Sequence, residues 1–208
     1  MTNFIRLSTI LTIVTAVAAF VLAEIYDITK PLIDIQKLAK TQEALSIVMP
    51  SAKFKSVVQK IPVKDGKGKI LYEKEEIMYY KAYSPTDTGQ IIGYAFKAKG
   101  NGYSSVIETM VGIDTTGKIK KIKIISQKET PGLGALAVES GPFNGKKWST
   151  EQFIGKTTAG LKVDKDGGSI VSITGATITS RAVTNSIKSK LQILIPKLGI
   201  STENKIGG

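Results

Sequence analysis

A long apolar segment without charged residues opens the hydrophobic pattern of this chain. Leu7–Ala23 contains seventeen consecutive uncharged residues, close to the roughly 20 that a helix needs to cross a bilayer. Arg6 precedes the segment, and Glu24 and Asp27 follow it. Because positive charge is favoured on the cytoplasmic side, this asymmetry predicts a cytoplasmic N-terminus and a domain on the extracytoplasmic side of the inner membrane. We predict a single-pass transmembrane anchor over residues 1–26.

A cleaved signal peptide is the alternative interpretation of this segment. Ala16–Ala18 has the small residues of a processing site. The apolar segment continues beyond that site to Ala23, which favours a retained anchor.

The next segment has apolar residues at helical spacing. Pro31 suits the start of a helix, and the apolar residues that follow share one face up to Val48, shortly before Pro50. We predict a connecting helix over residues 27–50. Because residues 51–69 are polar and rich in Lys and Gly, we predict an irregular stretch after it.

Residues 51–208 form the predicted extracytoplasmic domain, and their pattern is that of strands followed by helices. Asp114–Gly117 predicts a hairpin turn. Trp148 and Phe153 are expected to pack a short helix against the core. The fold class is therefore α+β, with an antiparallel sheet and a few helices. The predicted strands cover residues 77–83, 91–98, 106–113, 119–124 and 169–173.

A hydroxyl-rich turn precedes the predicted C-terminal helix. Apolar residues recur at helical spacing from Val183 to Leu194, and Ser172–Ser180 lies directly before them. A helix start presents unpaired backbone N–H groups and the positive end of the helix dipole, which suit a phosphate. Gly175–Ala176 would let a bulky ligand approach the backbone closely. The alternative is that these hydroxyl groups only cap a structural helix.

A second glycine-containing segment is Gln127–Gly134. Pro131–Gly132 predicts a tight turn, and Gly134 adds a further flexible point. Glu129 and Thr130 place one acid and one hydroxyl just before the turn. Alone, this segment predicts only a loop after a strand.

The composition excludes most catalytic chemistries. The chain has 208 residues and no Cys, which excludes disulfides, thiolate zinc sites, Cys-ligated iron–sulfur clusters, cysteine nucleophiles and a lipoprotein anchor. It has no His, which removes the commonest general base and the usual catalytic metal ligand. Such a chain obtains its chemistry from a cofactor or performs none.

The charge of the chain is strongly positive. The formal net charge is +12, and only Arg6 and Arg181 among the 29 basic residues are Arg, so 27 are Lys. Sequence-specific nucleic-acid binding relies on Arg forks, so we predict no nucleic-acid partner. The scattered Lys residues predict a solvated surface; the alternative is attraction to anionic lipid headgroups or to an acidic partner subunit.

Together, two segments resemble a known family. Lys128–Gly134 reads K-E-T-P-G-L-G, and Thr174–Ala182 reads T-G-A-T-I-T-S-R-A. In order and separation they resemble the FMN-binding subunits of ion-translocating redox complexes, which are the G subunit of the Rnf complex and the C subunit of the sodium-translocating NADH:quinone reductase. The resemblance covers most of the chain, from the membrane segment to about Pro196. The short length is more similar to the G subunit of the Rnf complex.

The resemblance implies a covalent cofactor. FMN would be joined through its phosphate to Thr177. The Gly100–Ser105 loop is similar to a loop that approaches the cofactor in the family; the alternative is that it only connects two strands. The residues implied to frame the phosphate are Thr174, Gly175 and Ala176, and those implied to lie against the flavin are Glu129, Thr130, Gly132, Leu133 and Gly134.

One position departs from the family pattern. The family usually has an Asp where this chain has Val171, and the nearest acids upstream are Asp164 and Asp166. Near the motifs, Lys128 and Glu129 are candidates to tune the flavin, and Arg181 is a candidate to face the phosphate.

The resemblance also implies a function. No side chain is placed for hydride or proton chemistry, so we expect an electron relay in an Rnf-type membrane complex that couples ferredoxin/NAD electron transfer to sodium or proton translocation. The implied partners are the other membrane subunits, together with a flavin transferase that uses FAD and magnesium to attach the flavin. The alternatives are a subunit of a sodium-translocating NADH:quinone reductase, a stand-alone flavin electron carrier, and a cofactor-free membrane-anchored binding domain.

Overall fold

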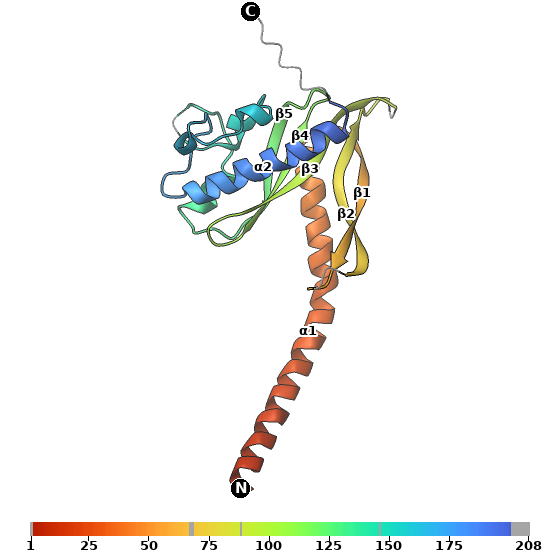
Figure 1. The fold of residues 1–208 in the computed structure, drawn as a ribbon, viewed down its shortest axis with the longest axis vertical. Helices are drawn as coiled ribbons and strands as arrows, with labels where there is room; N and C mark the ends of the chain where they lie inside the picture. The colour runs from red at the N-terminus through yellow and green to blue at the C-terminus, as the bar shows by residue number, and fades with distance from the viewer. Residues whose placement is uncertain (1, 67–68, 88, 146, 201–208) are drawn as a thin grey trace, which may run out of the picture. The chain divides into compact units, whose positions relative to one another are not determined.

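The computed structural model describes residues 2–66, 69–87, 89–145 and 147–200 and has the α+β fold that the sequence predicts (Figure 1). The chain divides into two compact units, Met1–Gln42 and Glu43–Gly208. The helices and strands are α1 (Thr2–Val48), β1 (Lys53–Lys64), β2 (Ile70–Tyr83), β3 (Ile91–Asn101), β4 (Val106–Ile113), β5 (Ile119–Ser126) and α2 (Thr177–Lys197), and the short 3-10 segments are Gly134–Val138, Thr150–Phe153, Thr158–Gly160 and Asp164–Asp166.

The N-terminal helix is longer than predicted. We expected a helix to start near Pro31, but α1 continues through this residue as one helix. A proline inside a helix removes one backbone donor and costs about 3 kcal/mol. The apolar segment before Pro31 and the helical pattern after it both favour a helix, so α1 continues through the proline.

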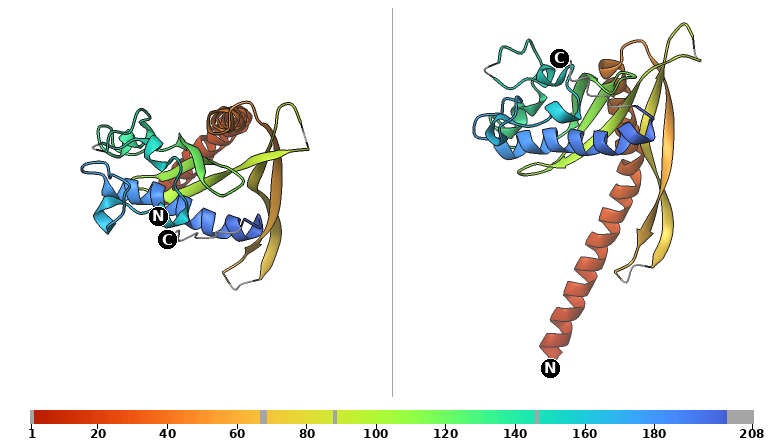
Figure 2. Two further views of the ribbon diagram at one scale, coloured as in Figure 1. Left: turned by 90° about the horizontal axis from the view of Figure 1, so that it is seen from above. Right: turned by 45° about the horizontal axis from the view of Figure 1, so that its top comes forward.

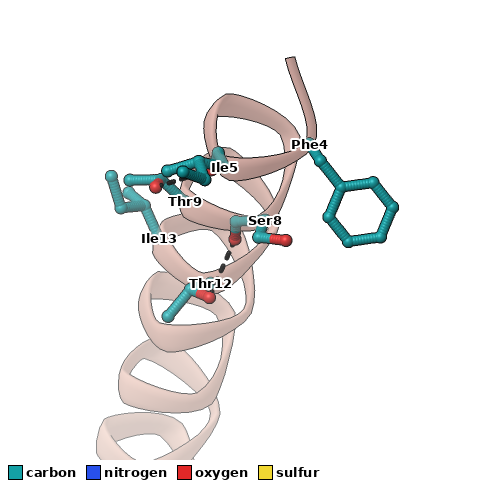
Figure 3. Close-up of a pocket in the computed structure, with 6 residues that line it drawn as sticks. All are labelled: Phe4, Ile5, Ser8, Thr9, Thr12 and Ile13. Carbon is teal, nitrogen blue, oxygen red and sulfur yellow. Dashed lines mark hydrogen bonds between the residues drawn. The ribbon is translucent and has the colours of Figure 1, made fainter. Parts of the chain in front are cut away.

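Part of α1 is long and apolar enough to cross a membrane, and none of that stretch is buried inside the protein. Thr9, Thr12 and Thr15 each donate a hydrogen bond to the backbone carbonyl four residues earlier, at 2.9 Å. Their hydroxyl groups therefore have acceptors within the helix, as a lipid environment requires. A shallow depression on this helix is lined by Phe4, Ile5, Ser8, Thr9, Thr12 and Ile13 (Figure 3).

The five strands form an antiparallel sheet in chain order, from β1 to β5. The predicted hairpin turn between β4 and β5 is confirmed. Asp114 Oδ1 accepts hydrogen bonds from the backbone N–H groups of Thr116, at 2.8 Å, and Lys118, at 3.0 Å. Gly117 takes a φ of 83°, in the left-handed region that glycine tolerates best.

Side chains pack against both faces of the sheet. Successive residues of a strand point to opposite faces, so Phe96 and Val111 join the core under α2, whereas Ala95 and Met110 join a smaller core with the last turn of α1. The two cores explain why β3 and β4 are apolar on both faces. The residues that α2 buries in the larger core are Ala182, Val183, Ile187, Leu191, Leu194 and Ile195.

α2 approaches the sheet closely at one glycine (Figures 1 and 2). A Cβ atom on Gly100 would lie 2.3 Å from the backbone oxygen of Ala182. The close packing of α2 on β3 therefore depends on the absence of a side chain there. It fixes the position of the helix that begins at Thr177, the last residue of Thr174–Thr177, here called the T-G-A-T motif.

Several predicted elements differ in the structure. β2 begins at Ile70, well before the predicted start at Ile77. Residues 51–69, expected to be irregular, contain β1; Val58–Pro62 are exposed, so the apolar residues there show no clear alternation. The strand predicted over residues 169–173 is wrong, because only one bridge forms there, between Val163 and Ile170. The short helix expected near Phe153 consists of 3-10 turns. The predicted core packing is confirmed: Trp148 and Phe153 are buried in edge-to-face contact, with ring centroids 5.7 Å apart.

Candidate functional site

The T-G-A-T motif forms a turn that ends at the first residue of α2. The N–H of Ala176 donates to the carbonyl of Ile173 at 3.0 Å, and Gly175 takes a φ of +74°. A side chain at Gly175 would be strained by this φ and would touch Leu133 of the other motif loop, whose Cδ2 lies 3.0 Å from the ideal Cβ position. The turn therefore brings the two sequence motifs together and starts the helix at Thr177.

The start of α2 lacks a side-chain cap. Its N-cap is Ala176, and none of the described side chains accepts a hydrogen bond from the first helical N–H groups. The first N–H groups of a helix have no partner within the helix, and they carry the positive end of its dipole. This end of α2 is consequently an available site for an anion.

Thr177 differs from the other hydroxyl residues of the first turns of α2. Thr179 donates to Glu129 at 2.6 Å, Ser180 donates to the carbonyl of Ala176 at 3.1 Å, and both residues are buried. Thr177 is half-buried, and its hydroxyl makes no hydrogen bond with the described residues. It is thus the free hydroxyl within the first turn of the helix. Thr174 is exposed in the turn outside the helix.

Glu129 connects the two loops to α2. Its carboxylate accepts hydrogen bonds from the N–H groups of Tyr103, Ser104 and Ser105 at 2.9–3.0 Å, from the Ser105 hydroxyl at 3.1 Å, and from the Thr179 hydroxyl at 2.6 Å. Only 6% of the residue is exposed. Burial opposes ionisation, but these hydrogen bonds outweigh it and lower the pKa of Glu129. Both carboxylate oxygens are therefore engaged by the protein.

Two glycines let this connection form. A Cβ on Gly102 would lie 2.6 Å from the Glu129 carboxylate, and one on Gly134 would lie 2.7 Å from the Thr179 hydroxyl. The predicted tight turn is confirmed: the N–H of Leu133 donates to the carbonyl of Thr130 at 3.2 Å. Glycine at positions 102 and 134 thus allows Glu129 to lie close to α2.

Exposed apolar side chains lie on the segments that meet at the start of α2. Leu133 comes from the Pro131–Gly134 turn, Tyr103 from the loop that Glu129 holds, and Ile178 from the first turn of α2; all three are exposed. The sequence pattern had not singled out Ile178, although its apolar side chain inside a hydroxyl-rich helix start is a signal in retrospect. Lys128 is also exposed, and its N–H donates to the Ser105 hydroxyl at 2.8 Å.

Arg181, the candidate to face the phosphate, pairs with an acidic residue of the protein. Its Nη2 and Nε donate to the carboxylate of Asp166 at 2.6–3.1 Å. The hydrogen bonds from Arg181 lower the pKa of Asp166. This ion pair ties α2 to the Asp164–Asp166 turn, so the guanidinium serves first to hold the segment before the motif.

Side chains brace the segment that contains Val171. Gln152 Oε1 accepts from the N–H of Val171 at 2.7 Å, and its Nε2 donates to the Val171 carbonyl at 3.3 Å. The hydroxyl and N–H of Ser172 both donate to Asp164, and the hydroxyl hydrogen bond is the main cause of the lowered pKa of Asp164. An acid therefore contacts the residue next to Val171, although position 171 itself carries none. Within the described residues, no group of three or more acidic side chains is arranged to hold a metal ion.

Comparisons with known proteins point to one family. Residues 102–192 match the family described as FMN-binding domain. The chain is 33% identical over 195 residues to the G subunit of the Na⁺-translocating ferredoxin:NAD⁺ oxidoreductase complex of Acetobacterium woodii, with 90% of both chains covered. It is 32% identical to the G subunit of the proton-translocating ferredoxin:NAD⁺ oxidoreductase complex of Clostridium ljungdahlii, covering 88% of this chain and 86% of the relative. Among solved structures, the C subunit of the Na⁺-translocating NADH-quinone reductase of Parabacteroides distasonis matches with a TM-score of 0.45 and 25% identity, over 58% of this chain and 61% of that chain.

Proposed function

This chain belongs to the family of G subunits of ion-translocating oxidoreductase complexes, and from this premise we propose that it carries FMN covalently on Thr177 and relays electrons in an Rnf-type complex. The match to an FMN-binding domain supports FMN as the cofactor. It also favours a flavin-carrying protein over a cofactor-free binding domain.

The observation that carries the proposal is the free hydroxyl of Thr177 at an uncapped helix start. A phosphate joined to this oxygen would lie at the positive end of α2 and would accept hydrogen bonds from its unpaired N–H groups. Gly175 leaves room beside it, since only the tip of Leu133 approaches its Cβ position. The residues present therefore fit the phosphate end of FMN.

Thr177 would hold the cofactor through a phosphoester at Oγ1. A flavin transferase would supply the FMN moiety of FAD: a bond from Thr177 Oγ1 to its phosphorus would replace the pyrophosphate bond, with AMP as the leaving group and the hydroxyl proton passing to solvent. Such a bond would leave the ring system free of covalent contact with the protein.

The protein's own contribution is to position the flavin. When bound, FMN accepts and donates one or two electrons. Leu133, Tyr103 and Ile178 offer exposed apolar surface for the flat ring, and Glu129 fixes the loops that carry the first two of them. No described side chain near Thr177 is a free acid or base, which agrees with electron relay instead of substrate conversion.

The proposal places the FMN domain outside the cytoplasm. α1 is a candidate membrane span, and Arg6 before the apolar segment, with Glu24 and Asp27 after it, favours a cytoplasmic N-terminus. A covalent bond would keep the flavin attached there, where a dissociated cofactor would be lost. The partners in this proposal are the other membrane subunits of the complex and the flavin transferase.

The attachment site can be tested by flavin fluorescence in denaturing gels under ultraviolet light. The full chain is expressed with a flavin transferase as wild type, Thr177→Val, Thr177→Ser and Thr174→Val. We expect a fluorescent band for wild type and Thr174→Val, none for Thr177→Val, and a band for Thr177→Ser, which keeps the hydroxyl. Fluorescence that persists in Thr177→Val and disappears in Thr174→Val would move the attachment to the exposed threonine of the turn.

A further inference from the structure

The outer part of the β1–β2 hairpin extends beyond the five-stranded sheet. β1 pairs with β2 along its whole length, whereas β3 pairs with β2 only over Tyr80–Tyr83. Residues 57–64 of β1 and 70–79 of β2 therefore form a two-stranded ribbon with no third strand among the described residues; we call these residues the ribbon. It projects from the edge of the sheet (Figures 1 and 2).

The ribbon is apolar where a solvated hairpin would be polar. Six of its large apolar side chains are each 40–60% exposed. Two apolar pairs form across the strands, Val58 opposite Ile77 and Val63 opposite Tyr72. No register shift separates the two pairs, so Ile61, Val63 and Tyr72 share one face of the ribbon, and Val58 and Ile77 share the other. Isolated exposed apolar residues are normal on protein surfaces, but neighbouring ones indicate an interaction surface. The six residues are Val58, Ile61, Ile70, Leu71, Tyr72 and Ile77.

The protein's own core does not support the outer ribbon. Met78 and Tyr79 still pack against the large core, but every described residue from Ile70 to Ile77 is exposed. A two-stranded hairpin alone is only marginally stable in water and gains stability by packing its faces against another surface. The ribbon consequently has the properties of an element whose packing partner comes from outside this chain.

The charges of the ribbon describe the partner. Charges of both signs are interspersed along it: Lys60 lies opposite Glu75, and its ammonium is 3.7 Å from the Glu73 carboxylate. Lys74, Glu75 and Glu76 are exposed. Insertion into an anionic bilayer would bring Glu73, Glu75 and Glu76 close to like charges, whereas a protein surface can complement both signs. Pro62 lacks an N–H on the outer edge of β1, which disfavours addition of a further strand there and favours contact through side chains.

We propose that the ribbon is a docking surface for another subunit of the complex, whose facing surface carries apolar side chains and charges of both signs. This inference rests on the proposed membership of a membrane complex. It assigns to the β1–β2 hairpin a role separate from that of the FMN site.

Cross-linking tests the contact directly, because the chain has no Cys. Leu71→Cys is labelled with benzophenone-4-maleimide in membranes that hold the complete complex, and Ile193→Cys, which is exposed on α2, is the matched control. We expect ultraviolet light to join the Leu71→Cys chain to one other subunit that the control does not reach. Adducts with lipid alone, no adduct, or the same adduct from both positions would overturn the proposal.

Assembly gives a second readout. A Leu71→Ser, Tyr72→Ser double variant should reduce co-purification of the other subunits by about tenfold or more, while the covalent flavin band is retained. Normal assembly of this variant would contradict the proposal. A dark wild-type band with an intact cross-link would instead overturn the proposed FMN attachment and leave the docking surface in place, so the two failures are distinguishable.

Discussion

Glu129 joins three segments that are distant in the sequence through one carboxylate. It holds the Tyr103–Ser105 loop, the loop that contains Glu129 itself, and Thr179 of α2, which lies 50 residues further along the chain. Thr179 is two positions from Thr177, so this carboxylate positions the proposed attachment residue without contacting it. Removing its charge should loosen the site and weaken the fold together.

The pH dependence of stability should reveal this role. The pKa of Glu129 is lowered in the folded protein, so its contribution is complete above the usual pKa of about 4.3 and is lost as the pH falls through the lower folded value. At pH 7, Glu129→Gln should lower the free energy of unfolding by about 1–3 kcal/mol. Urea unfolding in detergent from pH 7 to pH 3 should show the difference from wild type narrowing with acid. The exposed Glu139→Gln is the control, and a pH-independent difference for Glu129→Gln would contradict the assignment.

In contrast to the hydrogen-bonded carboxylate of Glu129, one buried hydroxyl in the sheet should destabilise the fold. Thr109 is 0% exposed, and its hydroxyl has no hydrogen-bond partner among the described residues. Thr109→Val keeps the shape and removes an unsatisfied polar group, so it should raise the free energy of unfolding by about 1 kcal/mol. Thr184→Val is the matched control: Thr184 is equally buried, but its hydroxyl donates to the Ser180 carbonyl at 2.8 Å. Losing this hydrogen bond should lower the free energy of unfolding. Thermal unfolding of both variants measures the direction of each change in stability.

The sequence located the motif loops but could not give the roles of their side chains. Pro131–Gly132 predicted a turn from local conformational preferences, and the structure has that turn. The bonds of Glu129 and the pairing of Arg181 with Asp166 depend on contacts across the fold, which no local pattern records. For the same reason, Thr177 could be identified as a candidate from the motif, but not as the residue whose hydroxyl is left free.

At the scale of elements, the contact between α2 and β3 controls the position of the site. Gly100→Ala would place a Cβ 2.3 Å from the Ala182 carbonyl oxygen, so the helix or strand must move. We expect a loss of about 1–3 kcal/mol in the free energy of unfolding, with reduced covalent flavin because α2 carries Thr177. Gly141→Ala, where a Cβ meets nothing within 4 Å, is the control. Chemical denaturation and flavin fluorescence measure both effects, and equal behaviour of the two variants would refute the close-packing argument.

The elements that could be predicted are those with one consistent environment. β3, β4 and α2 bury their apolar residues in a core, and the sequence shows the corresponding pattern. β1 was missed because Lys residues are interspersed along it and Val58–Pro62 are exposed on both faces, so burial imposes no period-two pattern there. The helix start predicted near Pro31 was wrong for a different reason. The preference of proline for helix starts was overridden by helix-forming sequence on both sides of it.

At the scale of the whole molecule, the proposed sidedness can be measured with the same Cys-free chain. A variant whose only Cys is Glu139→Cys should react with a membrane-impermeant maleimide in intact spheroplasts. A cysteine inserted after Met1 should react only after permeabilisation. The reverse pattern would place the FMN domain in the cytoplasm and remove the argument that covalent attachment prevents loss of the flavin.

The order of the sheet has a consequence for when the chain matures. Each strand pairs with its neighbour in the sequence, so the sheet can form progressively as the chain is made, whereas α2 is the last element and completes the core. Thr177 reaches its place beside the Leu133 turn only once that final helix has docked. If the flavin is attached to Thr177 as proposed, and the modifying enzyme requires this assembled turn, then the flavin permanently marks chains that finished folding. Chains without flavin would then report the fraction that did not.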